Sequence, residues 1–289
     1  MGNKQSYQIP GQLSLYDLEI LLPMEKQSTE DLLENLRHKD VKGYRVKTVK
    51  AGRMLECEIY PIYARNEAGR ARNTVPSRQA QENLNHRNTR KYIVRLTNHN
   101  FTDADQWTTL GYDDDKLPPD ISTAKKDLMN FLRRIKRKMK KRGLPDLKFL
   151  YVTEFCNDGK RIRCHHHVIM SGGLSRDEVE NTWHGGAYPQ TRRLRVREDC
   201  GLTGLASYLA KGKRYERRWG HSRNLKPPII TTADHKITRR QVERMIIDEN
   251  EIPAIMERKC KGYLFRGIEI KRSEFVAGAY VYIQMYRRC

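Results

Sequence analysis

Residues 147–170 read LKFLYVTEFCNDGKRIRCHHHVIM and predict the β-hairpin that decides the fold. Residues 147–155 are rich in aromatic and β-branched side chains, which are typical of a strand. Asp158 and Gly159 suit the centre of a tight turn. Three histidines and an apolar run follow, and they predict the second strand of the hairpin.

The turn decides which side chains of this hairpin share a face. With the turn centred on residues 158–159, Glu154 falls opposite Arg163 and diagonal to His165. Side chains alternate between the two faces of a strand, so His165 and His167 point to the side of Glu154. A slip of one residue in the pairing would turn Glu154 to the other side.

Two imidazoles and one carboxylate on a common face predict a metal site. Glu154, His165 and His167 would leave open positions on the ion for a substrate. Such a mixed set of nitrogen and oxygen ligands accepts Mn²⁺ or Mg²⁺, with Zn²⁺ as a further option. The alternative is an ordinary buried strand, because adjacent histidines before an apolar run also occur in cores.

A nucleophile is predicted downstream, on a helix over residues 202–215. Tyr208 and Lys211 are three residues apart, so the helix places a phenol beside an ammonium that can bind phosphate or favour the phenolate. Tyr215 lies seven residues after Tyr208 and returns to nearly the same face. It is an alternative nucleophile, although a packing or DNA-stacking role suits it better.

These residues resemble the HUH endonuclease superfamily, in particular its single-tyrosine rolling-circle replication initiators of plasmids, phages and integrated elements. His165, His166 and His167 are similar to the metal motif of that superfamily, with a histidine where its middle position is usually hydrophobic. Tyr208 and Lys211 match its nucleophile motif. The resemblance covers about residues 90–215.

The resemblance implies a metal-dependent enzyme that nicks and rejoins single-stranded DNA through a 5′-phosphotyrosine. Tyr208 would attack, Lys211 would assist, and His165, His167 and Glu154 would hold the ion. The expected substrate is single-stranded or hairpin DNA at a replication origin. The expected partners are a host helicase, because the chain carries no G-x-x-x-x-G-K-[ST] loop, and a host polymerase that extends the free 3′-hydroxyl.

Three other functions stay open. A conjugative relaxase or a transposase would use the same residues on a different DNA site. A DNA-binding regulator with a structural metal would bind DNA without cutting it. An RNA-binding protein would use similar cationic and aromatic groups.

The charge of the chain supports a polyanionic partner. Lys and Arg number 56 against 35 Asp and Glu, giving a net charge of +21. Cationic and aromatic residues from two stretches are the predicted nucleic-acid contacts. They are Arg133, Arg134, Lys136, Arg137, Lys138, Lys140, Lys141, Arg214, Arg217, Arg218 and Trp219.

Alternating helical and strand patterns predict an α+β fold, with helices packed on a central antiparallel sheet. We expect an N-terminal segment, a hairpin over residues 41–63 with a basic linker, the nuclease domain, and a C-terminal extension of unassigned role. Their predicted limits are residues 1–40, 41–90, 91–223 and 224–289. The remaining predicted elements are strands over 91–96, 107–112, 191–196 and within 262–286, and helices over 121–142 (capped by Ser122), 175–183 and 238–247.

The cysteines form no C-x-x-C pair and no apolar run is long enough to span a bilayer, so we expect a cytoplasmic protein with reduced thiols and no membrane contact. Near the N-terminus, residues 12–16 resemble the short peptide by which bacterial proteins dock on the sliding clamp. Its predicted anchors are Gln12, Leu13, Leu15 and Tyr16. The alternative is that these leucines pack the terminus against the rest of the chain.

Overall fold

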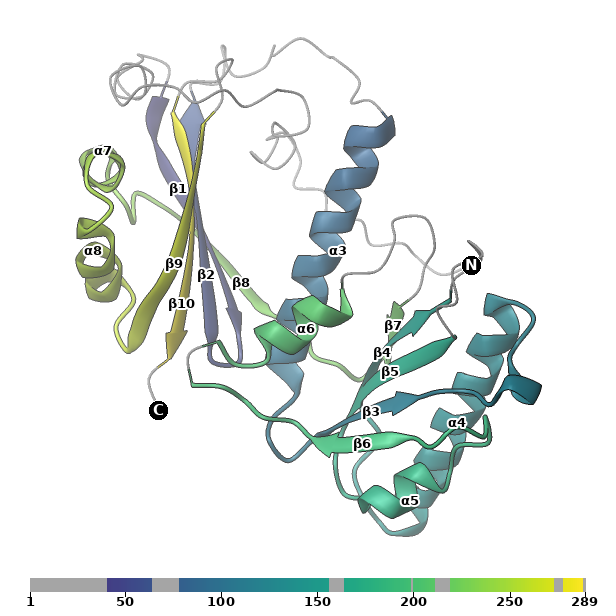
Figure 1. The fold of residues 1–289 in the computed structure, drawn as a ribbon. Coiled ribbons are helices and arrows are strands. Elements are labelled where there is room, and N and C mark those ends of the chain that lie inside the picture. Colours follow the sequence, from purple (N-terminus) through teal and green to yellow (C-terminus); the bar gives the residue numbers. More distant parts are fainter. Residues whose placement is uncertain are drawn as a thin grey trace. The chain divides into compact units, whose positions relative to one another are not determined.

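The computed structural model describes the chain in six stretches, residues 41–63, 78–155, 164–198, 200–210, 219–272 and 278–287. The described residues form two compact units. The first draws on residues up to Val49, from Glu56 to Arg87 and from Ile230 to Met285; the second draws on Lys50–Leu55, Asn88–Ile229 and the residues from Tyr286 onward. Each unit contains most of one five-stranded sheet, so the predicted α+β class is confirmed (Figure 1).

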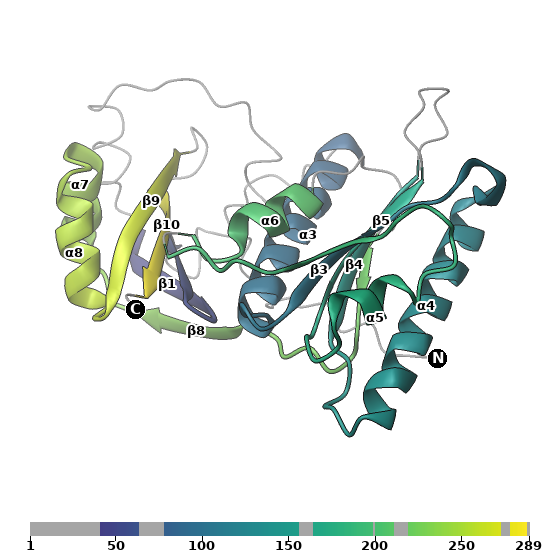
Figure 2. The same ribbon diagram turned by 60° about the horizontal axis from the view of Figure 1, so that its bottom comes forward.

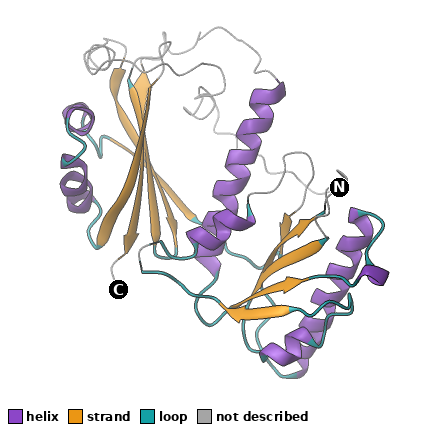
Figure 3. Ribbon diagram, in the orientation of Figure 1, coloured by secondary structure: helices purple, strands orange, loops and turns teal. Residues whose placement is uncertain are grey.

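The second unit is built on a sheet with the strand order β6-β3-β5-β4-β7, in which every neighbouring pair is antiparallel. Its strands are β3 (Gln106–Leu110), β4 (Phe149–Glu154), β5 (His165–Met170), β6 (Gln190–Arg193) and β7 (Trp219–His221). Its helices are α4 (Ile121–Lys141), α5 (Arg176–Glu180), α6 (Thr203–Leu209) and the second half of α3 (Arg78–Asn100), with a short 3₁₀ turn at Asp114–Lys116 (Figure 3).

The predicted hairpin is present, but its pairing differs from the expected one by two residues. Glu154 lies directly opposite His165, and Val152 lies opposite His167. The expected partner, Arg163, and the predicted turn at residues 157–160 lie outside the described residues. Because the shift is an even number of residues, Glu154 still shares a face with His165 and His167.

The two faces of this sheet are covered by different helices (Figure 2). On one face, Val168 and Met170 pack with Phe131 and Ile135 of α4. The other face carries a second apolar core, formed with residues of α3 and α6. Its members include Leu150, Val152 and Ile169 of the sheet, Ile93 and Leu96 of α3, and Ala206 and Leu209 of α6.

The helix α4 follows its predicted pattern, apart from its cap. Asp120, and not Ser122, is the N-cap: its carboxylate accepts a hydrogen bond from the backbone N–H of Thr123 at 2.8 Å. Gly143 ends the helix with a φ of 67°, a conformation that glycine adopts without strain. The predicted apolar face is buried, and it comprises Leu128, Phe131, Leu132, Ile135 and Met139.

The strand predicted over residues 91–96 was wrong, because these residues belong to α3. Ile93, Val94 and Thr97 are buried together at the i, i+1 and i+4 spacing of one helix face. The Asn98 side chain donates to the carbonyl of Val94, one turn earlier in the helix. Packing of this face into the core outweighs the strand preference of the β-branched residues.

The first unit is built on a sheet with the order β8-β1-β2-β10-β9. The predicted hairpin is confirmed as β1 (Val41–Ala51) and β2 (Met54–Tyr63). The C-terminal part supplies the other three strands, and α7 and α8 lie beside the sheet (Figure 1). These elements are β8 (Ile229–Asp234), α7 (Arg239–Ile247), α8 (Glu251–Lys259), β9 (Tyr263–Arg272) and β10 (Ala279–Arg287).

The helix predicted over residues 238–247 is confirmed as α7, which starts after a capping box of Thr238 and Gln241. The helix predicted over residues 175–183 is shorter, ending at Glu180, and its N-cap is Ser175. Within the described stretches, no helix combines the length and the hydropathy that a bilayer crossing requires.

Candidate functional site

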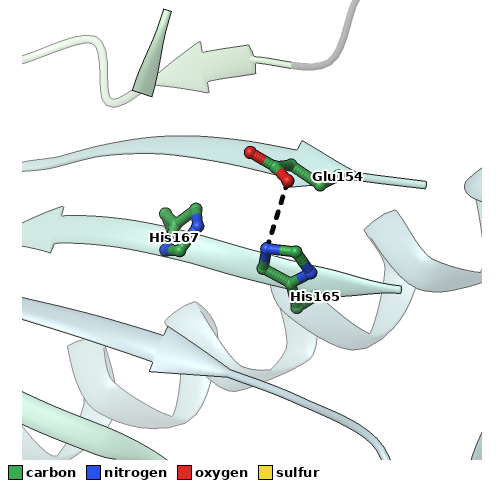
Figure 4. A group of neighbouring side chains, drawn as sticks. All are labelled: Glu154, His165 and His167. Carbon is green, nitrogen blue, oxygen red and sulfur yellow. Dashed lines mark ion pairs between the residues drawn. The ribbon is translucent and has the colours of Figure 1, made fainter. Parts of the chain in front are cut away.

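Three side chains of the β4–β5 hairpin converge on one face of the sheet (Figure 4). Glu154 ends β4 and His165 begins β5, so the pairing puts them side by side, with Oε2 of the glutamate 3.2 Å from Nε2 of the histidine. His167 follows on the same face. One potential ligand atom from each residue lies within 4.8 Å of the other two. The sequence had predicted this same trio.

His167 has one ring nitrogen bonded and one unused. Its Nδ1 lies 3.2 Å from Oγ1 of Thr109, its cross-strand neighbour on β3. Its Nε2 is buried and has no hydrogen-bond partner among the residues that the structure describes. Burial, with a smaller effect of a charge on His165, lowers the pKa of His167 to about 4. The ring is therefore neutral at pH 7, the form that binds a metal.

His166 points to the opposite face, as strand alternation predicts. Its Nε2 is 2.9 Å from the hydroxyl of Tyr112, and its Nδ1 is 2.9 Å from Oγ1 of Thr153. Its side chain is fully buried, and burial lowers its pKa to about 3. With both nitrogens bonded inside the helix-covered core, His166 has none to offer to an ion on the other face.

Tyr208 lies on the face of the sheet that carries the three potential ligands. Its ring centroid is 5.8 Å from that of His167 and 6.4 Å from that of Trp107. The rings of Trp107 and His167 are 5.8 Å apart, so the three rings form one cluster. Tyr208 is 48% exposed, which leaves its phenol accessible to a substrate.

The position of Tyr208 is set by how α6 is held. The side-chain oxygen of Asn98 accepts from the backbone N–H of Leu202, and its nitrogen donates to Oγ1 of Thr203, the first residue of the helix. Ala206 and Leu209 are buried in the core between the sheet and α3. This packing leaves Tyr208 on the side of the helix near His167.

Two residues of this site, Trp107 and Thr109, were missed. They lie two apart on β3, and their cross-strand partners on β5 are Ile169 and His167. The strand itself was predicted from the sequence. Its register against β5 was not, and that register places Thr109 beside His167, a potential metal ligand.

Several predicted site residues lie outside the described residues. They are Lys211, Arg214, Tyr215, Arg217 and Arg218, together with Gln12, Leu13, Leu15 and Tyr16 of the predicted clamp peptide. Trp219 is described. It lies opposite Val152, and its ring stacks on His221 at 5.7 Å with an interplanar angle of 23°. The ring of Tyr92 meets both of them edge-on. By the strand pairing, Trp219 and His221 share the face of the three potential ligands.

The cationic residues of α4 lie with the helix layer on the other face of the sheet. Arg134 and Lys138 have structural roles there: Arg134 donates to the carbonyl of Thr182, and Lys138 donates to Oγ1 of the same residue. The other predicted contacts on this helix are exposed to solvent, and they are Arg133, Lys136, Arg137, Lys140 and Lys141.

Residues 105–213 match the family model of the replication-associated protein ORF2/G2P. The match runs from the start of β3 past the end of α6, so it includes Glu154, His165, His167 and Tyr208. No curated protein and no solved structure matches the chain significantly. The predicted resemblance to HUH-type rolling-circle initiators is thereby confirmed over this stretch.

Proposed function

We propose that this protein nicks and rejoins a single DNA strand at a specific site and thereby initiates rolling-circle replication of a plasmid, phage or mobile element. The observation that carries the proposal is the packing of Tyr208 against His167, beside Glu154 and His165, inside the matched segment. An accessible phenol next to a potential metal site is the arrangement that phosphoryl transfer by a tyrosine requires.

Glu154, His165 and His167 would hold a divalent cation, and their chemistry fits that role. They offer one carboxylate and two imidazoles, a set suited to Mn²⁺ or Mg²⁺ and also open to Zn²⁺. The buried Nε2 of His167 has no hydrogen-bond partner in the described part of the chain, and coordination to an ion would satisfy this nitrogen. When bound, the cation would polarise the scissile phosphate and stabilise its developing negative charge.

Tyr208 would make the new bond to DNA, and Lys211 would assist it. The Tyr208 oxygen attacks the phosphorus as its proton departs, a phosphotyrosine bond forms, and the bond from phosphorus to the 3′ oxygen breaks. The leaving 3′ oxygen takes up a proton. Lys211 would assist Tyr208 by binding phosphate or favouring the phenolate. Because one phosphodiester replaces another, a 3′-hydroxyl can later reverse the step without ATP.

The substrate is proposed to be single-stranded or hairpin DNA. The net charge of +21 favours a polyanion. Trp219, His221 and Tyr92 form an aromatic cluster, and its two β7 members share the face of the site. Aromatic rings of this kind stack on unpaired bases. The free 3′-hydroxyl would then prime a host polymerase behind a host helicase, and residues 12–16 would recruit the bacterial clamp.

The experiment uses single-stranded oligonucleotides labelled at either end, taken from the replicon that encodes the protein, with Mn²⁺ present. A label on the 3′ side of the nick should migrate with the protein in denaturing gels, because Tyr208 keeps the 5′ phosphate. A label on the 5′ side should appear on a free, shorter strand. A chelator should stop both products.

The alternatives give different results in the same assay. DNA binding without cleavage would favour a regulator with a structural metal. Tighter binding of RNA than of DNA, again without cleavage, would favour an RNA-binding protein. Cleavage at a transfer origin or a transposon end, in place of a replication origin, would favour a relaxase or a transposase.

A further inference from the structure

The three consecutive histidines differ in which of their ring nitrogens are already bonded. Nε2 of His165 faces Glu154. Both nitrogens of His166 are taken, by Tyr112 and Thr153. Within the described stretches, His167 has a hydrogen-bond partner at Nδ1, Thr109, and none at its buried Nε2. His167 therefore has one nitrogen held by a neighbouring strand and the other buried without a hydrogen-bond partner among the described residues.

This arrangement selects one tautomer of His167. A neutral imidazole carries a single N–H, at Nδ1 or at Nε2. An N–H at Nε2 would be buried with nothing to accept it, which is costly. An N–H at Nδ1 can donate to Oγ1 of Thr109, 3.2 Å away. The Nδ1–H tautomer satisfies the hydrogen and leaves a lone pair on Nε2.

We propose that Thr109 is a positioning residue of the metal site: it accepts the Nδ1–H of His167, and so fixes the ring and presents Nε2 to the ion. The inference rests on the proposed role of His167 as a metal ligand. Residues that hold the second nitrogen of a ligating histidine set its tautomer and orientation and raise its basicity. Thr109 suits this role because it lies directly opposite His167 in the antiparallel pair of β3 and β5.

The neighbouring residue supplies a matched control. Thr108 is fully buried on the other face of β3, where its hydroxyl meets that of Thr191 at 3.2 Å. Thr108→Val removes a threonine hydrogen bond from the same strand without touching His167. Thr109→Val removes the hydroxyl with little change of shape, and Thr109→Ser retains the hydroxyl.

The test measures Mn²⁺ binding to the full chain by calorimetry. Thr109→Val should weaken binding about 10-fold or more, in line with the loss of other partners of metal-bound histidines. Thr109→Ser should restore most of the affinity, and Thr108→Val should bind as the wild type does. Equal affinity of Thr109→Val and wild type would overturn the inference, as would equal losses in Thr109→Val and Thr108→Val.

A second measurement keeps the inference testable if a variant fails to fold or if the wild type binds no metal. Nitrogen-15 NMR of the metal-free wild type, assigned with His167→Gln, reports which nitrogen of His167 carries the proton. The inference predicts the Nδ1–H form. An Nε2–H form would overturn it, even if the wild type binds metal. A wild type that shows the Nδ1–H form yet binds no divalent cation would contradict the proposed function and leave the Thr109 contact in place.

Discussion

Tyr208 and His167 are 41 residues apart in the chain, yet their ring centroids lie 5.8 Å apart on one face of the sheet. The histidine comes from a central strand and the tyrosine from a helix packed over the same face. The fold thus brings the predicted nucleophile next to the predicted metal site.

The first prediction contrasts the three histidines. His165→Ala and His167→Ala should each abolish metal-dependent cleavage, because each removes a ligand, and they should leave the protein folded. His166→Ala should bind Mn²⁺ but lower the free energy of unfolding by about 2 to 4 kcal/mol, since it empties a buried site and unpairs two hydroxyls. Calorimetry with Mn²⁺ identifies the variants that lose a ligand, and urea unfolding identifies the variant that loses stability. Loss of Mn²⁺ binding in a folded His166→Ala protein would contradict the assignment of faces.

The second prediction concerns acid stability. Burial lowers the pKa of His166 to about 3 and that of His167 to about 4, whereas both would titrate near 6.5 in an unfolded chain. The unfolded chain therefore takes up more protons below pH 6.5. The metal-free protein should keep the full contribution of these groups above that pH and lose it progressively as the pH falls toward 4.

Urea unfolding between pH 7.5 and 4.5, with a chelator present, measures this loss. His166→Leu should flatten the dependence, because it removes the more deeply buried of the two groups. A wild-type stability that stays constant from pH 7 to pH 5 would show that neither ring is held neutral by burial.

The third prediction uses salt to count DNA contacts. Affinity for single-stranded DNA should fall steeply with salt, with a slope of log K on log salt near −0.7 for each phosphate contacted. Arg137 and Lys141 are exposed on the helix layer, on the side of the sheet opposite the site. The double variant Arg137→Gln with Lys141→Gln should make the salt dependence of binding to long DNA less steep. It should leave cleavage of a short oligonucleotide unchanged. An unchanged slope on long DNA would remove α4 from the binding surface.

The fourth prediction concerns the N-terminal peptide. A synthetic peptide of residues 9–18 should bind a bacterial sliding clamp in calorimetry, because Leu15 and Tyr16 provide an apolar and an aromatic anchor. In the full chain, Leu15→Ala with Tyr16→Ala should remove clamp binding and leave nicking intact. If the peptide releases no heat and does not compete with a known clamp peptide, the segment is not a clamp ligand.

The sequence predicted the site better than it predicted the path of the chain. Strand alternation alone separates His166 from His165 and His167. Glu154 was assigned the right face from the wrong partner, because an even shift in register preserves the face. The register of β3 against β5 depends on contacts distant in the chain, so the roles of Trp107 and Thr109 could not be read locally.

Two larger features also depended on tertiary packing. Residues 91–96 carry strand-forming side chains, but they are held in a helix by the apolar core between α3 and the sheet. Two of the C-terminal strands, β8 and β10, pair with β1 and β2 of the N-terminal hairpin across most of the chain length, and no local pattern predicts such a pairing.

The central claim is that the Tyr208 oxygen becomes bonded to DNA. Its most direct test is mass spectrometry of the protein after reaction with a cleavable oligonucleotide and Mn²⁺, followed by nuclease and trypsin digestion. The account predicts a nucleotide phosphate on the peptide of residues 198–211, at Tyr208, and no adduct in a Tyr208→Phe protein that still binds DNA. An adduct on Tyr215, or an undiminished adduct in Tyr208→Phe, would contradict it.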